Sequence, residues 1–429
     1  MLGVYIYYVF LFLAISLLLI LTILSNKKTN KNKWKISLII LLCTLSYGII
    51  KSIKYSQTHP IHESSSKVFQ VASRFSSYIP IYNIGYFLKA LQEENLLDSI
   101  KNNILTYDLI TRETGIDNYI VIVGESARVG NMSVYGYLKP TTPKLQEQLE
   151  NIVLFNNAIS GAPITALAVP LALTKDTVTN HSIHNYPDNI INIANQAGFE
   201  TSWLSVQSAF GSKGTAVSSI AMNAQNKLWI TGYDKGLLLP LYEILNNNKE
   251  NKKKLIVLHL YGSHEPAENR YPPNAETAIF TEKNDGIDAE YDNSIRYTDD
   301  LLGELFEHFK DTKTSILYFS DHALERNPES STLYYHGGTS PSQEAYHVPM
   351  FIWYSPMINV GKNNKIINEF FSTIYNYQLI NAWMGIKHKT DISEPDIDNI
   401  INTYKDKYEV MDSGYNIYNY NELKHSHAK

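Results

Sequence analysis

The sequence predicts an α/β fold, a mostly parallel sheet sandwiched by helices, preceded by a two-helix transmembrane hairpin. From residue 118 onward, short apolar runs alternate with helical patterns, which is typical of a parallel sheet covered on both faces. Before that point, residues 2–24 are apolar and uncharged, and this length suffices to cross a bilayer as a helix. With 429 residues, 44% of them hydrophobic, the chain can bury a substantial core.

Residues 1–54 are expected to form the hairpin, because a second apolar run, 36–50, follows the first. That run is short for a span, but Ile53 and the flanking Trp34 and Lys51 extend it. The stretch between the runs, SNKKTNKNKWK, has five lysines and no acid, and such loops stay in the cytoplasm. The chain after the hairpin is therefore expected on the outer side of the membrane. The alternative is a cleaved signal peptide, which requires a basic first segment, yet the first lysine is Lys27.

The rest of the chain divides into three parts. Residues 55–117 are interpreted as a juxtamembrane connector, whose amphipathic stretch SSYIPIYNIGYFLKALQEENLL lies along the membrane interface or packs as a helix. Residues 118–388 form the α/β domain. Residues 389–429 are polar, rich in Tyr and Asn and weakly periodic, and are expected to be a peripheral C-terminal tail.

Each element of the α/β domain rests on its own run of residues. Buried strands are predicted at 118–124, 152–157, 201–206, 254–261, 314–320 and 348–354. Helices are predicted at 189–198, 237–248 and 289–310. The net charge of −5 gives no reason to expect a nucleic-acid partner. Because Cys43 is the only cysteine, the chain cannot form an intrachain disulfide.

Acidic and histidine side chains follow three of the predicted strands. Glu125 follows the first strand, His264 comes shortly after 254–261, and Asp321 and His322 follow 314–320, with His336 further along. Sites in open parallel sheets collect at the carboxyl ends of the strands. Carboxylate and imidazole ligands suit Zn²⁺, and less exclusively Mn²⁺. Each residue alone is also compatible with a solvated loop, but their joint placement predicts a metal site.

Two hydroxyl groups are candidate nucleophiles. Ser126 is adjacent to Glu125, but adjacent side chains of an extended chain point to opposite faces, so we expect the two to diverge. Thr165 stands at a predicted helix start after a Gly-Ala-Pro turn. The free N–H groups and positive dipole end there favour an alkoxide and an incoming phosphate. The alternative for Thr165 is a plain N-cap.

Several longer motifs resemble a known family. They are VGESARVGNMSVYGYLKPTTPKL, SGAPITALAVP, QAGFETSWLSVQS, YDNSIRYTDDLL, SDHALE and HVPMFIWYS, together with the GSHEP and RYPP segments, in residues 118–355. In this order they resemble the phosphoethanolamine transferases of Gram-negative inner membranes, which belong to the sulfatase and alkaline-phosphatase-like superfamily. The hairpin and outer domain fit as well, although relatives often have five membrane helices.

The resemblance assigns roles residue by residue. It implies that Glu125, Asp321 and His322 hold zinc together with Thr165, which is the nucleophile, and that Ser126 is a bystander. His264 and His336 would line the headgroup site or bind a second Zn²⁺, and Lys213 would contact phosphate. The donor is then phosphatidylethanolamine, and the acceptor is a hydroxyl of lipopolysaccharide or another periplasmic glycan. The catalytic domain would be periplasmic, anchored in the bacterial inner membrane.

Two departures from the family pattern bear on the acceptor. Enzymes that modify lipid A usually flank the nucleophile with disulfide cysteines, where this chain has Ser160 and Leu171. After the SDH motif, the usual Gly-Glu-Ser is Ala323-Leu324-Glu325. Both departures speak against lipid A as the acceptor, and the SGAPIT form resembles that of transferases that modify core heptose or other periplasmic glycans.

Other functions remain open at this stage. A phosphatase or a phosphoglycerol transferase would share the metal chemistry and differ in acceptor or donor. A sulfatase requires Pro two residues after its modified Cys or Ser and Arg two residues after that, whereas Arg128 and Gly130 stand at those places after Ser126. A non-catalytic, membrane-anchored binding protein would lack bound zinc.

Overall fold

The computed structural model describes residues 105–208, 214–246, 252–326, 334–338, 341–358, 365–390 and 396–424. These residues belong to one compact unit, Leu96–Lys429. The predicted hairpin, most of the connector and Lys213 lie outside the described residues. Among the described helices, none is long and apolar enough to cross a membrane.

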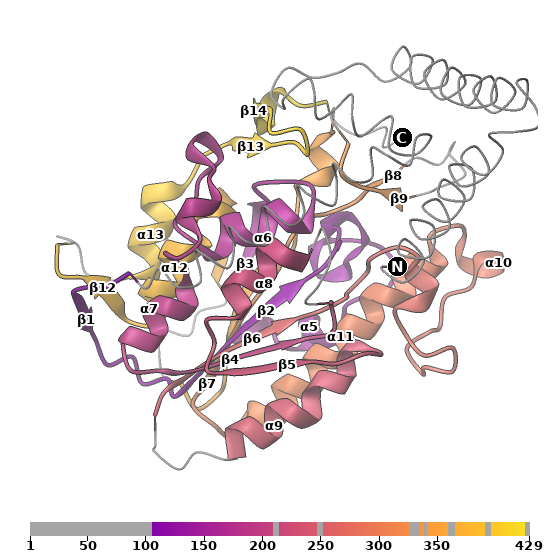
Figure 1. Cartoon of the computed structure of the whole chain (residues 1–429). Helices are drawn as coiled ribbons and strands as arrows, with labels where there is room; N and C mark the ends of the chain where they lie inside the picture. Colours follow the sequence, from indigo (N-terminus) through magenta and orange to yellow (C-terminus); the bar gives the residue numbers. More distant parts are fainter. Residues whose placement is uncertain are drawn as a thin grey trace, which may run out of the picture. The chain divides into compact units, whose positions relative to one another are not determined.

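An eight-stranded sheet forms the centre of the described domain (Figure 1). Its strands, in spatial order, are β11 (Lys365–Ser372), β3 (Ile152–Ile159), β10 (Met350–Tyr354), β7 (Thr314–Ser320), β2 (Asn118–Gly124), β6 (Lys254–His259), β4 (Glu200–Ser205) and β5 (Asn226–Trp229). β10 is antiparallel to both its neighbours, and every other pairing is parallel. The structure thus confirms the predicted mostly parallel α/β sheet.

Helices cover both faces of the sheet, because the central strands are apolar on both sides (Figure 1). In β2, Tyr119, Val121 and Val123 join one core, while Ile120 and Ile122 join the other. The first core includes residues of α7 (Ile190–Gln196), α8 (Gly214–Ala221), α12 (Asn376–Trp383) and α13 (Ile397–Tyr404). The second includes residues of α5 (Pro143–Glu147), α9 (Leu238–Asn246) and α11 (Ala289–Phe309). α6 (Thr165–Leu173) and α10 (Glu282–Asp285) complete the described α-helices.

Within the described residues, three small antiparallel pairs lie outside the main sheet. They are β1 (Leu109–Thr111) with β12 (Ile386–His388), β8 (Glu325–Arg326) with β9 (Tyr334–Tyr335), and β13 (Glu409–Met411) with β14 (Ile417–Asn419). The first pair shows that the domain includes residues before 118. The last pair belongs to the segment interpreted as a peripheral tail, yet Val410, Met411 and Asp412 are buried. For Val410 and Met411 the peripheral interpretation is wrong, because each packs in an apolar cluster of the domain.

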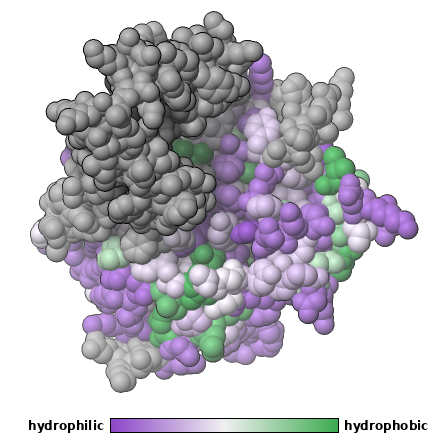
Figure 2. All heavy atoms as spheres, turned by 45° about the vertical axis from the view of Figure 1, so that its right-hand side comes forward, coloured by the Kyte–Doolittle hydropathy of each residue, from purple (hydrophilic) through white to green (hydrophobic). Residues whose placement is uncertain are grey.

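On the face of the molecule shown in Figure 2, hydrophilic side chains predominate among the residues drawn in colour, and apolar ones are scattered between them. Scattered apolar side chains are normal on a folded surface.

Candidate active site

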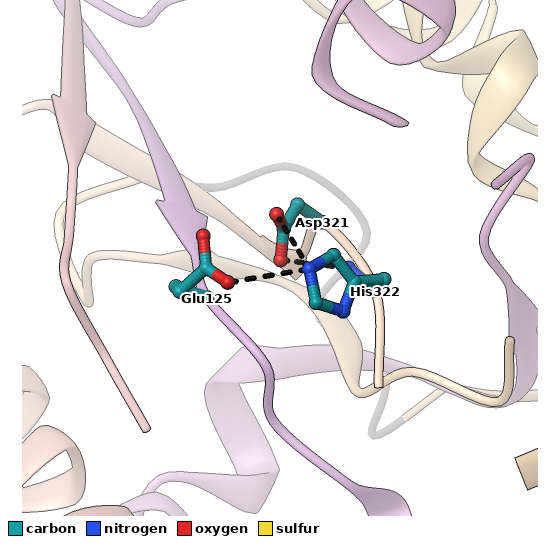
Figure 3. A group of neighbouring side chains, drawn as sticks. All are labelled: Glu125, Asp321 and His322. Carbon is teal, nitrogen blue, oxygen red and sulfur yellow. Dashed lines mark hydrogen bonds and ion pairs between the residues drawn. The ribbon is translucent and has the colours of Figure 1, made fainter. Parts of the chain in front are cut away.

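Glu125, Asp321 and His322 converge at the carboxyl ends of two neighbouring strands (Figure 3). β2 and β7 are parallel and in register, with Gly124 opposite Ser320, so the residues that follow them emerge side by side. One ligand atom from each of the three side chains lies within 4.8 Å of the others. All three residues are buried.

The hydrogen bonds of this cluster fit a divalent cation. Nδ1 of His322 pairs with the carbonyl oxygen of Ala323 (2.9 Å), so Nε2 faces Glu125 Oε1 (3.2 Å) and Asp321 Oδ2 (3.5 Å). Oδ2 of Asp321 accepts no hydrogen bond within the described part of the chain, although it is buried. A buried carboxylate oxygen without a donor is costly. Two carboxylates and an imidazole are a donor set that Zn²⁺ prefers, and a cation there would satisfy the unpartnered oxygen.

The three ligand candidates shift one another's pKa values, because they are buried together. Burial, reinforced by the charge of Glu125, raises the pKa of Asp321 to about 8. Burial opposes the charged form of His322, but Asp321 and Glu125 outweigh it and raise the pKa of His322 to about 9. Burial likewise opposes ionised Glu125, yet the hydrogen bond and charge of His322 hold the pKa of Glu125 well below its usual range.

Metal binding is therefore expected to weaken as the pH falls. Since the pKa values of Asp321 and His322 are about 8 and about 9, both groups carry protons at pH 7 that a metal must displace. The apparent zinc affinity should rise by roughly two orders of magnitude per pH unit between pH 6 and 7.5, where both protons must leave. Calorimetric titration in buffers of different ionisation enthalpy counts the protons released. A flat affinity with no proton release would contradict this electrostatic description.

Thr165 contacts the cluster from α6. Its Oγ1 donates to Glu125 Oε2 (2.9 Å) and lies 3.4 Å from His322 Nε2. Thr165 is the first residue of α6, whose N-cap residue, Ile164, makes no side-chain cap. The hydroxyl thus faces the cluster, and the alternative of a plain N-cap does not hold.

The prediction that the side chains of Ser126 and Glu125 diverge is wrong. Its φ of 60° takes the chain out of the extended conformation, and its Oγ donates to Glu125 Oε1 (2.7 Å). The backbone N–H of Ser126 donates to Asp321 Oδ1 (3.1 Å). Ser126 therefore orients both carboxylates.

The two histidines predicted at the site lie next to the cluster. His336, which follows β9, stacks on His322 with ring centroids 4.8 Å apart. His264, which comes after β6, has its ring centroid 5.5 Å from that of His336. Residues 264 and 336 thus lie beside the three ligand candidates, while Lys213 is outside the described residues.

Asp234 and Gly262 hold the loop that leads to His264. The carboxylate of Asp234 accepts from the N–H groups of Tyr261 (2.7 Å) and Gly262 (2.9 Å). Gly262 has a φ of +51°, and a Cβ there would lie 2.6 Å from the carbonyl oxygen of Glu125. Glycine is therefore required where this loop packs against Glu125.

Gln207 is a site residue that the sequence reasoning missed. Its Nε2 donates to Glu125 Oε2 (2.9 Å) and to the carbonyl oxygen of Leu260 (2.7 Å). Ser205 holds Gln207 in turn, because its Oγ accepts from the Gln207 N–H (3.0 Å). Oε2 of Glu125 thus receives donors from Gln207 and Thr165, whereas Oε1 faces His322. A glutamine at a strand end carries no signal by itself.

Replacing Gln207 with methionine, which keeps the length but removes the donors, is expected to weaken zinc binding by about tenfold. Glu125 would then lose a donor that fixes the rotation of its carboxylate. Competition with a chromophoric chelator measures the affinity. Gln146→Met is the matched control, because Gln146 hydrogen bonds to Ser133, on another part of the domain. An unchanged affinity in Gln207→Met would show that this amide has no orienting role.

The residues that depart from the family pattern pack closely in this structure. The hydroxyl of Ser160 lies within hydrogen-bond distance of the carbonyl oxygens of Asp321 and Ala162. Leu171 is buried against Gly161. Leu324 is buried and Glu325 accepts from the N–H of Ser342 (2.7 Å). A hydroxyl therefore connects the Thr165 loop to the Asp321 loop at a position where a disulfide cysteine was expected from the family.

Comparison with known proteins identifies the family. Residues 117–386 match the sulfatase family model, and residues 1–101 match the model of the transferase YhbX N-terminal domain. The chain belongs to the sulfatase family. This confirms the superfamily inferred from the motifs.

Relatives within the family include transferases. YhbX of Escherichia coli (strain K12) is 49% identical over 391 residues, which cover 91% of this chain and 71% of YhbX. The phosphoethanolamine transferase EptC of the same strain is 30% identical over 295 residues, 62% of this chain and 49% of EptC. The named phosphoethanolamine transferases are thus less similar to this chain than YhbX is.

Solved structures share the fold. The periplasmic domain of E. coli EptC has a TM-score of 0.65 at 22% identity, and the alignment covers 74% of this chain and 96% of that domain. The same domain with zinc gives 0.63 at 23% identity, again over 74% and 96%. The integral membrane protein EptA of Neisseria meningitidis gives 0.59 at 21% identity, over 86% of this chain and 73% of EptA. At these identities the likeness concerns the fold alone.

Proposed function

We propose that this protein transfers phosphoethanolamine from phosphatidylethanolamine to a hydroxyl of lipopolysaccharide or another periplasmic glycan, through a covalent intermediate on Thr165. The observation that carries the proposal is the position of Thr165 Oγ1, 2.9 Å from Glu125 Oε2 and 3.4 Å from His322 Nε2. A hydroxyl pointing from a helix N-terminus into a buried carboxylate–imidazole cluster is arranged as a nucleophile. The relation to phosphoethanolamine transferases supports the donor.

Glu125, Asp321 and His322 would hold the metal, for which their unpartnered oxygen and converging ligand atoms provide a place. When bound, zinc would lower the pKa of the Thr165 hydroxyl and neutralise charge on the phosphate. The zinc complex of the EptC domain supports this choice over Mn²⁺. His264 and His336, which lie beside this cluster, would line the headgroup site or bind a second zinc ion.

The proposed reaction consists of two displacements at phosphorus. In the first, Glu125 Oε2 accepts a hydrogen bond from the Thr165 hydroxyl. This bond fixes the direction of the lone pairs on Thr165 Oγ1. Thr165 Oγ1 forms a bond to phosphorus, the bond from phosphorus to the diacylglycerol oxygen breaks, and diacylglycerol takes up a proton. In the second, the acceptor oxygen forms a bond to phosphorus, the bond from phosphorus to Thr165 Oγ1 breaks, and the proton lost by the acceptor hydroxyl is balanced by the one that Thr165 takes up. His264 and His336, beside His322, are placed to carry protons for the leaving and attacking groups.

The location of the protein is part of the proposal. Residues 1–54 would anchor it in the inner membrane as a hairpin, with the sulfatase-family domain in the periplasm. EptC of E. coli has a periplasmic domain and EptA of N. meningitidis is an integral membrane protein, and both support this arrangement. An anchored site meets a lipid donor without extracting it from the bilayer.

Product analysis tests the reaction against its alternatives. The purified full chain would be given phosphatidylethanolamine labelled in the headgroup and a glycan extract. Label in the glycan supports transfer, while free phosphoethanolamine alone indicates a phosphatase. Transfer from phosphatidylglycerol but not from phosphatidylethanolamine indicates a phosphoglycerol transferase. If no product forms and no zinc is bound, the result indicates a non-catalytic binding protein.

A further inference from the structure

The C-terminal hairpin of β13 and β14 contacts the loop that leads into Thr165. The N–H of Met411 donates to the carbonyl oxygen of Gly161 (2.8 Å). The side chain of Met411 packs in one apolar cluster with Leu167 of α6. The hydroxyl of Tyr346 donates to the carbonyl oxygen of Met411 (3.1 Å) and fixes the strand from its other side. Segment 409–411 is thus attached to the nucleophile loop by backbone and side chain.

Two residues further on, the same hairpin contacts the loop that carries His336. Oγ of Ser413 donates to the carbonyl oxygen of Gly337 (2.7 Å) and lies 3.4 Å from that of Gly338. Gly337 has a φ of +76° and packs against Ile164, since a Cβ on it would lie 2.9 Å from Ile164 Cγ2. The residues that follow His336 therefore lie between Ser413 and the residue that precedes Thr165.

Asp412 makes the loop between the two contacts rigid. Its side chain is fully buried, and each of its two carboxylate oxygens accepts two hydrogen bonds. The donors are Gly414 N (2.7 Å) and Asn416 N (2.9 Å) for Oδ1, and Asn416 Nδ2 (2.9 Å) and Tyr418 OH (3.1 Å) for Oδ2. A buried carboxylate with this many donors fixes the backbone around it. The buried carboxylate of Asp412 thus fixes the positions of Met411 and Ser413 relative to each other.

We propose that the C-terminal hairpin clamps the Thr165 loop and the His336 loop together, and that Ser413 is a positioning residue for His336. His336 reaches the ligand cluster by stacking on His322 at 4.8 Å, so its placement depends on the backbone of residues 336–338. Ser413 secures that backbone by a hydrogen bond to a carbonyl group. The kinetic consequence rests on the proposed function, in which His336 moves protons, but the mechanical consequence does not.

Amide hydrogen exchange of the full chain in detergent tests the clamp without any substrate. Ser413→Ala should speed exchange in peptides containing Gly337 and Gly338 by roughly three- to tenfold, the effect of one lost hydrogen bond. Ser413→Thr, which keeps the hydroxyl, should restore protection. The matched control is Ser355→Ala, because the hydroxyl of Ser355 also donates to a backbone carbonyl, that of Thr312, but Ser355 follows β10 at the opposite end of the sheet.

Kinetics test the consequence for His336. Ser413→Ala should lower kcat for transfer by roughly three- to tenfold and leave zinc content and Tm as in Ser355→Ala. The pH profile of kcat should change in Ser413→Ala and return to normal in Ser413→Thr. Unchanged exchange at Gly337 and Gly338, or an equal change in Ser355→Ala, would overturn the clamp. If the wild-type chain transfers no phosphoethanolamine, the proposed function fails, and exchange alone then decides about the clamp.

Discussion

Replacing Thr165 with alanine is expected to lower the proposed transfer by at least about a thousandfold while zinc remains bound. In the proposed reaction this hydroxyl is the group that attacks phosphorus, and the alanine variant has no oxygen at that position. The remaining ligand candidates, Glu125, Asp321 and His322, keep their positions, since they are attached to β2 and β7. Turnover of labelled phosphatidylethanolamine and metal analysis of the same sample measure both effects.

Ser126→Ala is the matched control for Thr165→Ala. Ser126 also donates to Glu125, but to Oε1, and its role is to orient the carboxylate. Its removal should cost about tenfold or less in turnover. A large loss in Ser126→Ala together with full activity in Thr165→Ala would exchange the roles of the two hydroxyls and contradict the assignment.

Replacing Asp321 with asparagine is expected to release the metal and abolish transfer. Asparagine keeps an oxygen that can accept from the N–H groups of Ser126 and His322, so the fold around it should persist. It removes the negative charge that the metal needs. After dialysis against zinc buffer, the wild-type chain should retain about one zinc ion and Asp321→Asn close to none.

The same substitution should stabilise the metal-free protein. Because burial and Glu125 raise the pKa of Asp321 to about 8, well above the usual pKa of an unfolded Asp, its ionisation costs folding stability as the pH rises from about 4 to 8. Asparagine has no such cost, so the chelated variant should melt at a higher temperature than the chelated wild type at pH 7. With zinc the order should reverse. Equal zinc content in both proteins would remove Asp321 from the ligand set.

The centre of the fold could be predicted because buried strands leave a clear pattern. The runs at 118–124 and 314–320 match β2 and β7 residue for residue, since both strands are apolar on both faces. The edge strands could not be predicted in this way. β5 is largely exposed, and β11 is interrupted by a bulge between Ile367 and Phe370, so neither contains a continuous apolar run. The antiparallel direction of β10 depends on tertiary pairing and leaves no local signal.

The candidate site was predictable where it depends on strand ends. Glu125, Asp321 and His264 follow adjacent strands, so the topology brings them together. Interactions between distant loops were not predictable. The left-handed backbone of Ser126 reverses the direction that an extended chain would give its side chain. The amide of Gln207 reaches Glu125 across 82 positions of sequence. The contact of Ser413 with Gly337 comes from a segment whose composition indicated a tail.

The central claim is that a divalent cation held by Glu125, Asp321 and His322 makes Thr165 the nucleophile. Peptide mass spectrometry after acid quenching tests it most directly, using zinc-loaded protein mixed with phosphatidylethanolamine without acceptor. We expect one added phosphoethanolamine group on the peptide that contains Thr165, absent after chelation and absent in Thr165→Ala. Modification of Ser126 instead, or full turnover of the chelated protein, would contradict it.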